Sequence, residues 1–113
     1  MIDLICSRTC STCRKAVALL DEKGIAYRYR EYTKEPLSEE EIRDVLRLLG
    51  VGPQDVLRIK DAKARGLTGD EPDGELIAAM ARHPTLLQRP IGIAGGKAVV
   101  GRPPENLLSL ETR

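Results

Sequence analysis

The chain contains no phenylalanine and no tryptophan, and its only aromatic residues are Tyr27, Tyr29 and Tyr32. With so few rings, we expect no platform on which nucleic-acid bases stack, and the core must be built from Leu, Ile, Val and Ala. An excess of either charge is also lacking. The 18 basic and 17 acidic residues leave a formal net charge of +1, which gives no general argument for binding nucleic acid directly.

Long apolar runs and a secretory signal are absent as well. No stretch of the 113 residues is apolar enough to span a membrane. The opening segment M-I-D-L-I-C has no basic region, so we expect a cytoplasmic protein with reduced cysteines. The length suits one compact domain, and we expect residues 1–113 to form a single domain that is monomeric.

The most informative segment is C-S-T-C, where Cys10 and Cys13 follow a short apolar stretch and precede a helical pattern. The apolar stretch predicts a buried strand, and the apolar positions after Cys13 recur on one helical face that Gly24 ends. Cys10 therefore falls at a helix N-terminus, where free N–H groups and the helix dipole favour a thiolate. We expect Arg8, Arg14 and Lys15 to add positive charge around it.

A Cys-x-x-Cys pair can also be half of a zinc site, a structural disulfide, or a chance occurrence. Zinc needs four ligands, and beyond the pair only Cys6 and the distant His83 are available, so we expect no metal. His83, which precedes Pro84, is better interpreted as a helix-end residue. A structural disulfide is disfavoured without a secretory signal. The order strand, Cys-x-x-Cys, helix favours redox or nucleophilic chemistry.

The remaining patterns complete a fold prediction. A strand is expected over residues 25–32, and Ser38 with Glu41 forms a capping box for a helix that ends at Gly50. Weaker signals predict short turns near 53–57, 62–64 and 85–87 and a helix around 76–80. A hairpin follows, and Pro103 and Pro104 open a last helix in which Leu107, Leu108 and Leu110 can pack. The order is β-α-β, a helical insert over about residues 38–88, then β-β-α. It predicts a thioredoxin-like α/β fold, a mixed sheet with flanking helices.

Over its whole length the chain resembles the ArsC family of glutaredoxin-like arsenate reductases and the related Spx-type redox regulators. The resemblance rests on I-C-S-R-T-C-S-T-C-R-K-A, V-L-R-I-K, H-P-T-L-L-Q-R-P-I and V-V-G-R-P-P-E. It implies that Cys10 is the nucleophile that attacks arsenate and that Arg58, Arg89 and Arg102 hold the oxyanion. Pro90 takes the place where this fold commonly carries a cis-proline. Taken singly, each arginine is better interpreted as a solvated surface charge, and only the set of three favours an oxyanion site.

Cys13 is available as an internal thiol that resolves the arsenic adduct. Cys6 stands where the family often has a histidine, and it is either a second candidate for resolution or, as we favour, a buried apolar residue. We expect no bound cofactor. An external thiol system, either thioredoxin or glutaredoxin with glutathione, must reduce the disulfide, and the Cys10/Cys13 pair favours a dithiol donor such as thioredoxin.

The leading functional prediction is a cytoplasmic arsenate reductase. The alternatives are an Spx-like redox-sensing regulator that binds RNA polymerase and a general thiol–disulfide oxidoreductase. The resemblance implies that relatives that do not reduce arsenate usually lack an arginine at the place of Arg102. The presence of Arg102 therefore favours the enzyme.

Overall fold

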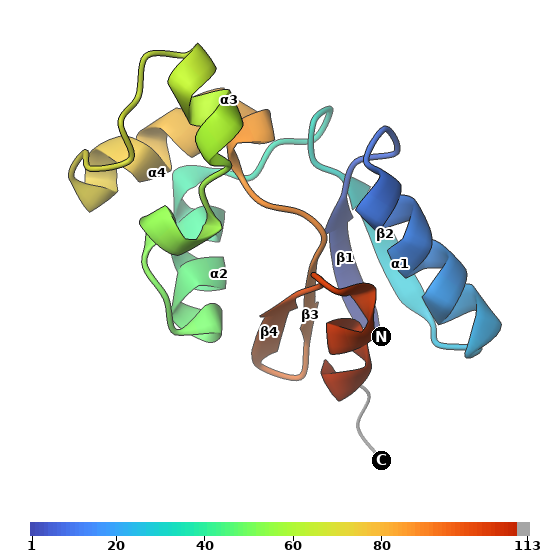
Figure 1. The fold of residues 1–113 in the computed structure, drawn as a ribbon. Coiled ribbons are helices and arrows are strands. Elements are labelled where there is room, and N and C mark those ends of the chain that lie inside the picture. Colours follow the sequence, from blue (N-terminus) through green and yellow to red (C-terminus); the bar gives the residue numbers. More distant parts are fainter. Residues whose placement is uncertain (111–113) are drawn as a thin grey trace. The chain divides into compact units, whose positions relative to one another are not determined.

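The computed structural model describes residues 1–110, and the chain divides into two compact units. The sheet unit contains Met1–Glu35 and the C-terminal segment from Arg89, and the helical unit is Pro36–Gln88 (Figure 1). The helical unit comprises the segment expected as a helical insert. Within residues 1–110, no helix combines the length and the apolar composition needed to cross a bilayer.

The sheet unit is built on a four-stranded sheet in the order β2-β1-β3-β4. The strands are β1 (Ile2–Cys6), β2 (Tyr27–Glu31), β3 (Ile91–Ala94) and β4 (Lys97–Val100). Strand β1 pairs with β2 in parallel and with β3 in antiparallel fashion, and β3 forms an antiparallel hairpin with β4. The sheet is therefore mixed, as the sequence predicts, and β1 is one of its two inner strands.

One face of this sheet is covered by helix α1 (Ser11–Glu22) and the 3-10 helix η3 (Pro104–Leu110) (Figure 1). Their shared core contains Ile2, Leu4, Cys6, Cys10, Cys13, Ala16, Leu20, Leu107 and Leu110. The last helix has 3-10 geometry with three residues per turn, so it buries Leu107 and Leu110. Leu108, which the sequence also predicts to pack, is only half-buried.

The helical unit contains α2 (Glu39–Leu49), η1 (Pro53–Val56), α3 (Ile59–Ala64), α4 (Asp73–Arg82) and η2 (Pro84–Leu86). The predicted capping box of α2 is confirmed. The Glu41 N–H donates to the Ser38 hydroxyl at 3.1 Å, and the Ser38 N–H donates to the Glu41 carboxylate at 2.9 Å. Gly50 ends the helix with a φ of 71°, a left-handed conformation that glycine adopts without steric cost.

Two helices of this unit are longer than their sequence signals indicate. Helix α3 spans Ile59–Ala64, although the sequence predicts only a turn near 62–64, and α4 begins at Asp73, ahead of its first apolar positions. Two backbone hydrogen bonds hold the segment before α3. The Arg58 N–H donates to the Leu86 carbonyl and the Gln88 N–H donates to the Val56 carbonyl, each at 2.8 Å. These bonds join residues distant in sequence, so local periodicity does not show them.

Candidate functional site

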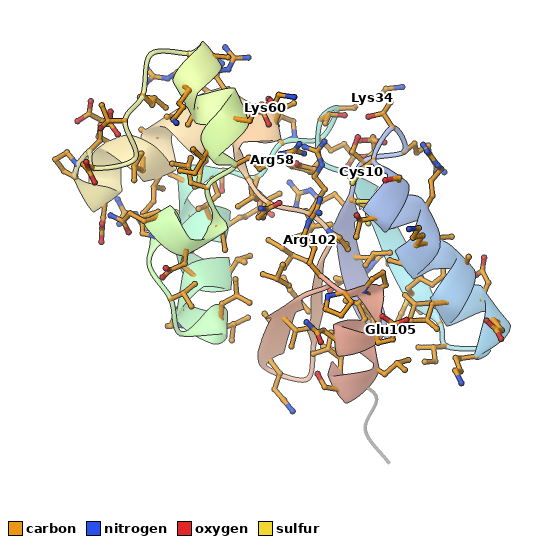
Figure 2. All side chains as sticks on the ribbon, in the orientation of Figure 1. Cys10, Lys34, Arg58, Lys60, Arg102 and Glu105 are labelled. Carbon is orange, nitrogen blue, oxygen red and sulfur yellow. The ribbon has the colours of Figure 1, made fainter. Side chains whose placement is uncertain are left out.

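The Cys-x-x-Cys segment lies at the turn between β1 and α1, as the sequence predicts. The Cys10 N–H donates to the Ser7 carbonyl at 3.1 Å, which closes a tight turn immediately after the strand. Cys10 is the N-cap of α1, with an extended backbone, and its carbonyl accepts the Arg14 N–H at 3.1 Å. The first thiol therefore lies at the N-terminal end of a 12-residue helix (Figure 2).

All three cysteines are free thiols and gather in one cluster on the core side of this turn. Cys6 and Cys13 are 0% exposed, whereas Cys10 retains 7% exposure. Cys10 is thus the thiol that a small oxyanion reaches first. Among residues 1–110, no group of three or more His, Cys, Asp or Glu side chains is arranged to hold a metal ion.

The thiol whose pKa is clearly lowered is Cys13. The Cys6 side chain, acting as a hydrogen-bond donor, is the main cause of the lower pKa, whereas burial of Cys13 acts to raise it. The Ser7 N–H, the Cys10 side chain and the charge of Arg89 also lower the pKa, which comes to about 6. The Ser7 nitrogen lies 3.4 Å from the Cys13 sulfur. Conversely, the hydrogen bond to Cys13 and burial raise the pKa of Cys6 far above its ordinary value.

Arg102 reaches the Cys10 sulfur from the segment between β4 and η3 (Figure 2). Its Nη2 lies 3.7 Å from the Cys10 Sγ, and its Nε donates to the Arg89 carbonyl at 2.8 Å. The Asn106 side-chain amide donates to the Arg102 carbonyl at 3.2 Å. These contacts hold one guanidinium beside the thiol and leave it largely exposed to solvent.

Arg89, in the segment before β3, is a second cation that interacts with the same thiol. Burial alone would lower its pKa, but hydrogen bonds to Cys10 and Tyr32 outweigh burial and raise the pKa of Arg89, so it stays a cation. Its Nη1 donates to the Tyr32 hydroxyl at 3.1 Å. Its Nε is buried and has no partner among residues 1–110, although buried polar groups are nearly always hydrogen-bonded.

Pro90 occupies the expected position beside the site, and the Arg89–Pro90 peptide bond is cis. The Gly101 N–H donates to the Pro90 carbonyl at 2.8 Å, which ties the two arginine-bearing segments together. A Cβ at Gly101 would lie 2.9 Å from the Pro90 ring and 3.0 Å from Leu107. The glycine of G-R-P therefore permits the close approach that places Arg102.

Arg58, the third predicted arginine, belongs to the helical unit. It is the N-cap of α3, its Nε pairs with Asp61 at 2.9 Å, and its side chain is 25% exposed. Its Nη1 is buried and has no hydrogen-bond partner within residues 1–110. Its placement against the oxyanion stays a prediction, whereas Arg102 contacts the Cys10 thiol and Arg89 interacts with it electrostatically.

The basic residues of the Cys-x-x-Cys segment have partners other than the thiol. The Arg8 guanidinium lies 4.4 Å from the centroid of the Tyr29 ring, and the Arg8 N–H donates to Glu31 at 2.8 Å. The Arg14 guanidinium donates to the Arg8 carbonyl at 3.0 Å, and Lys15 is exposed. The guanidinium in contact with Cys10, that of Arg102, comes from the C-terminal segment.

Sequence reasoning missed Tyr32 as a site residue. The side chain is 1% exposed, and burial is the main reason that the pKa of Tyr32 is raised to about 12, so the phenol stays neutral. Its N–H donates to the Cys6 carbonyl at 3.1 Å, and its hydroxyl orients Arg89. The one signal in the sequence is its position at the end of the strand predicted beside the Cys-x-x-Cys strand.

A model of the ArsC family matches residues 6–110. The chain belongs to the ArsC family. An arsenate reductase of Neisseria meningitidis serogroup A is 41% identical over 102 residues, which cover 87% of this chain and 87% of that protein. The global transcriptional regulator Spx of Listeria innocua is 35% identical over 104 residues, which cover 89% of this chain and 79% of that protein.

Solved ArsC structures share the fold. The arsenate reductase from Vibrio cholerae matches with a TM-score of 0.90 and 33% identity over 97% of each chain. The thioredoxin-like α/β fold is therefore confirmed. Some relatives are named arsenate reductases, others are named transcriptional regulators, and others are uncharacterized, so family membership alone does not choose a function.

Proposed function

We propose that the protein is a thiol-dependent arsenate reductase in which Cys10 is the nucleophile. The observation that carries this proposal is the contact of the Arg102 guanidinium with the Cys10 thiol, with a second guanidinium anchored close by. Arg102 Nη2 lies 3.7 Å from the Cys10 sulfur, and its Nε donates to the carbonyl of Arg89, whose own guanidinium interacts with the charge of the same thiol. A thiolate that attacks an oxyanion brings two negative charges together, so cations at the point of attack are what this reaction requires.

An unused donor supports an oxyanion as the ligand. The Nε of Arg89 is buried without a hydrogen-bond partner among the described residues. An unpaired buried donor on a charged group is costly, and the oxygens of a tetrahedral anion would satisfy it. Guanidinium groups present planar donor forks that match pairs of such oxygens. Arsenate is the tetrahedral anion that a thiol also reduces.

The proposed reaction has two steps in the protein. The Cys10 thiolate attacks arsenic and forms a sulfur–arsenic bond, and one arsenate oxygen leaves as water. The Cys13 thiolate then attacks the Cys10 sulfur. The sulfur–sulfur bond forms as the sulfur–arsenic bond breaks, and the bonding pair stays with arsenic, which leaves as arsenite. The two thiols supply the two electrons and end as a disulfide.

An external thiol system completes the cycle by reducing the disulfide. Because both redox thiols come from the chain itself, we propose a dithiol donor of the thioredoxin type, with glutaredoxin and glutathione as the alternative. The low pKa of Cys13, about 6, suits this step, since a thiol of low pKa is the better leaving group in disulfide exchange.

A coupled assay tests the proposal. The purified protein is supplied with arsenate and either thioredoxin, thioredoxin reductase and NADPH, or glutaredoxin, glutathione, glutathione reductase and NADPH. We expect arsenate-dependent NADPH consumption with at least one system and none with Cys10→Ser. NADPH consumption that is equal with and without arsenate in both systems would overturn the proposal. Consumption with a small disulfide alone would instead identify a general thiol–disulfide oxidoreductase.

An Spx-like regulator is the second candidate, supported by the 35% identity to the Listeria protein. That function needs the Cys10/Cys13 pair as a redox sensor but no oxyanion donors. Binding of RNA polymerase that changes with the oxidation state of the pair, together with absent arsenate turnover, would favour it. Arg102 is the residue that separates the two candidates.

A further inference from the structure

The side chain of Asn106 bridges the two ends of the segment that carries Arg102. Its amide nitrogen donates to the Val100 carbonyl and to the Arg102 carbonyl, each at 3.2 Å. Val100 is the last residue of β4, and only Gly101 separates it from Arg102. The two partners also fix the orientation of the amide, because its oxygen would face two carbonyl oxygens if the group were turned over.

The segment around Arg102 depends on polar contacts of this kind. Pro103 and Pro104 come next in the chain, and neither has an N–H group that could hold the turn. Arg102 itself is exposed, so no packed core restrains its long side chain. The place of the Arg102 guanidinium beside Cys10 therefore depends on where the Arg102 backbone lies.

The helix η3 holds the Asn106 amide from a fixed base. Leu107, the next residue, is 0% exposed and belongs to the same core cluster as Cys10. The Asn106 N–H donates to the Pro103 carbonyl at 3.0 Å, which closes the first turn of the helix. The side chain of Asn106 thus joins the core beside the thiol to the segment that carries the guanidinium.

We infer that Asn106 is a positioning residue for the Arg102 cation: its amide fixes the backbone from which the guanidinium reaches the Cys10 sulfur. The 3.7 Å contact of Arg102 Nη2 with the sulfur and the 2.8 Å bond from its Nε to the Arg89 carbonyl both start from this backbone. The inference deepens the proposed function and rests on it only for the statement that the cation meets an arsenate ion.

Loss of the amide should leave the cation in the protein but misplace it. Without the Asn106 side chain, the Val100 and Arg102 carbonyls lose a shared donor, and the segment between them gains freedom. The guanidinium then spends less time beside Cys10, and an anion that approaches the thiol is attracted less. Because Asn106 acts through Arg102, its removal should change nothing further once Arg102 is absent.

The test compares how fast the Cys10 thiol reacts with an anionic and with a neutral alkylating reagent. Iodoacetate carries a negative charge, whereas iodoacetamide has a similar size and none. Both react with the thiolate, so the ratio of the two rate constants reports the positive charge near the sulfur and not the extent of ionisation. Each rate constant at Cys10 is measured on the reduced full chain at low ionic strength by peptide mapping.

The variants form a double-mutant cycle with a matched control. Asn106→Leu removes the amide and retains a similar volume, and Asn106→Ala serves as a second variant should leucine compromise folding. Arg102→Ala and the double variant Asn106→Leu/Arg102→Ala complete the cycle. Ser109→Ala is the control, because it removes a hydroxyl that donates to the Asn106 carbonyl at 2.8 Å from the same helix.

We expect Arg102→Ala to lower the iodoacetate-to-iodoacetamide ratio by about two- to fivefold, since a unit charge about 4 Å away in water changes a rate by up to roughly fivefold. Asn106→Leu should lower the ratio by about twofold or more, and the double variant should be no lower than Arg102→Ala. Ser109→Ala should keep the ratio of the parent. The differences should vanish at about 1 M salt, where exposed charges are screened.

A ratio equal to that of the parent in a folded Asn106→Leu or Asn106→Ala protein would overturn the inference. So would a double variant whose loss is the product of the two single losses, because Asn106 would then act independently of Arg102. An unchanged ratio in Arg102→Ala would also overturn it, since Asn106 would have no cation to position. None of these readouts involves arsenate, so a failure of the proposed function would appear in the coupled assay and leave the alkylation ratios as they are.

Discussion

Arg102 contacts the sulfur of Cys10 while it is bonded to the backbone of Arg89. Its Nε donates to the Arg89 carbonyl at 2.8 Å, and its Nη2 lies 3.7 Å from the Cys10 Sγ. One guanidinium thus links the Q-R-P-I and G-R-P segments to the thiol across 92 residues of sequence. Because Arg102 is bonded to the Arg89 backbone, the two arginines, which come from separate loops, lie in one cationic site.

Arg102→Ala should lower kcat/KM for arsenate by about tenfold or more. A charge-assisted hydrogen bond is worth about 1.5–3 kcal/mol, and about 1.4 kcal/mol corresponds to tenfold. The Cys10/Cys13 redox couple should stay largely intact, because Arg102 is exposed and its distance of 3.7 Å from the Cys10 sulfur is long for a hydrogen bond. Steady-state kinetics and a thiol–disulfide equilibrium measurement give the two quantities.

A matched control is Arg65→Ala, which removes the same charge from an exposed position at the end of α3. We expect its arsenate kinetics to equal those of the parent. Arg102→Lys should fall between parent and alanine variant, because an ammonium keeps the charge but loses the planar fork. Equal kinetics for Arg102→Ala and Arg65→Ala would count against an oxyanion site at Arg102.

Tyr32→Phe should weaken arsenate binding by leaving Arg89 without its phenolic acceptor. The bond from Arg89 Nη1 to the Tyr32 hydroxyl measures 3.1 Å and is partly buried. We expect KM to rise by up to about tenfold, equivalent to about 1.4 kcal/mol, with a smaller change in kcat. Tyr27→Phe is the control, because it removes an exposed hydroxyl that bonds Asp21 at 3.0 Å. A KM for Tyr32→Phe no higher than that of the control would show that the phenol does not orient Arg89.

The stability of the reduced protein should depend on pH through the thiol cluster. Cys13 has a pKa of about 6 in the folded protein against an ordinary value of 9.0. The contribution of the Cys13 thiolate to the free energy of unfolding is therefore complete above about pH 9, and it is lost as the pH falls through about 6. The pKa of Cys6 is raised from its ordinary 9.0. The contribution of the neutral Cys6 thiol to the free energy of unfolding is therefore complete below about pH 9 and is lost at higher pH. We expect the free energy of unfolding to rise from about pH 6 to about pH 9 and to fall above it.

Urea denaturation under reducing conditions measures this profile. Other titrating groups contribute as well, so the relevant quantity is the difference between the parent and Cys13→Ser at each pH. That difference should grow between about pH 6 and pH 9, since serine does not ionise there. Parallel profiles for the two proteins would rule out a thiolate at Cys13.

The elements around the site were predictable where local chemistry specifies them. Alternation in β2, the capping box at Ser38 and the apolar face of α1 each depend on residues close in sequence, and each prediction is confirmed. The bounds of α3 and α4 were not predictable. They depend on backbone bonds such as that between Arg58 and Leu86, which join segments that only the folded chain brings together.

The site residues likewise fall into those that the sequence predicts and those that it does not. Cys10 and Cys13 follow from their order along the chain, and Arg89 and Arg102 follow from the resemblance to the ArsC family. The role of Tyr32 does not follow from either, because Tyr32 meets Arg89 across 57 residues of sequence. The sequence also predicts charge near Cys10 from Arg8, Arg14 and Lys15; the Arg8 guanidinium packs on Tyr29 and that of Arg14 donates to the Arg8 carbonyl.

A single turnover of the reduced protein with arsenate, without any external thiol, tests the central claim most directly. Arsenite is quantified by chromatography, and disulfides are mapped by mass spectrometry after rapid alkylation. The account predicts one arsenite per protein molecule, a Cys10–Cys13 disulfide, no arsenite from Cys10→Ser, and no oxidation when phosphate replaces arsenate. No arsenite with all thiols intact, or arsenite together with a disulfide that leaves Cys10 free, would contradict it.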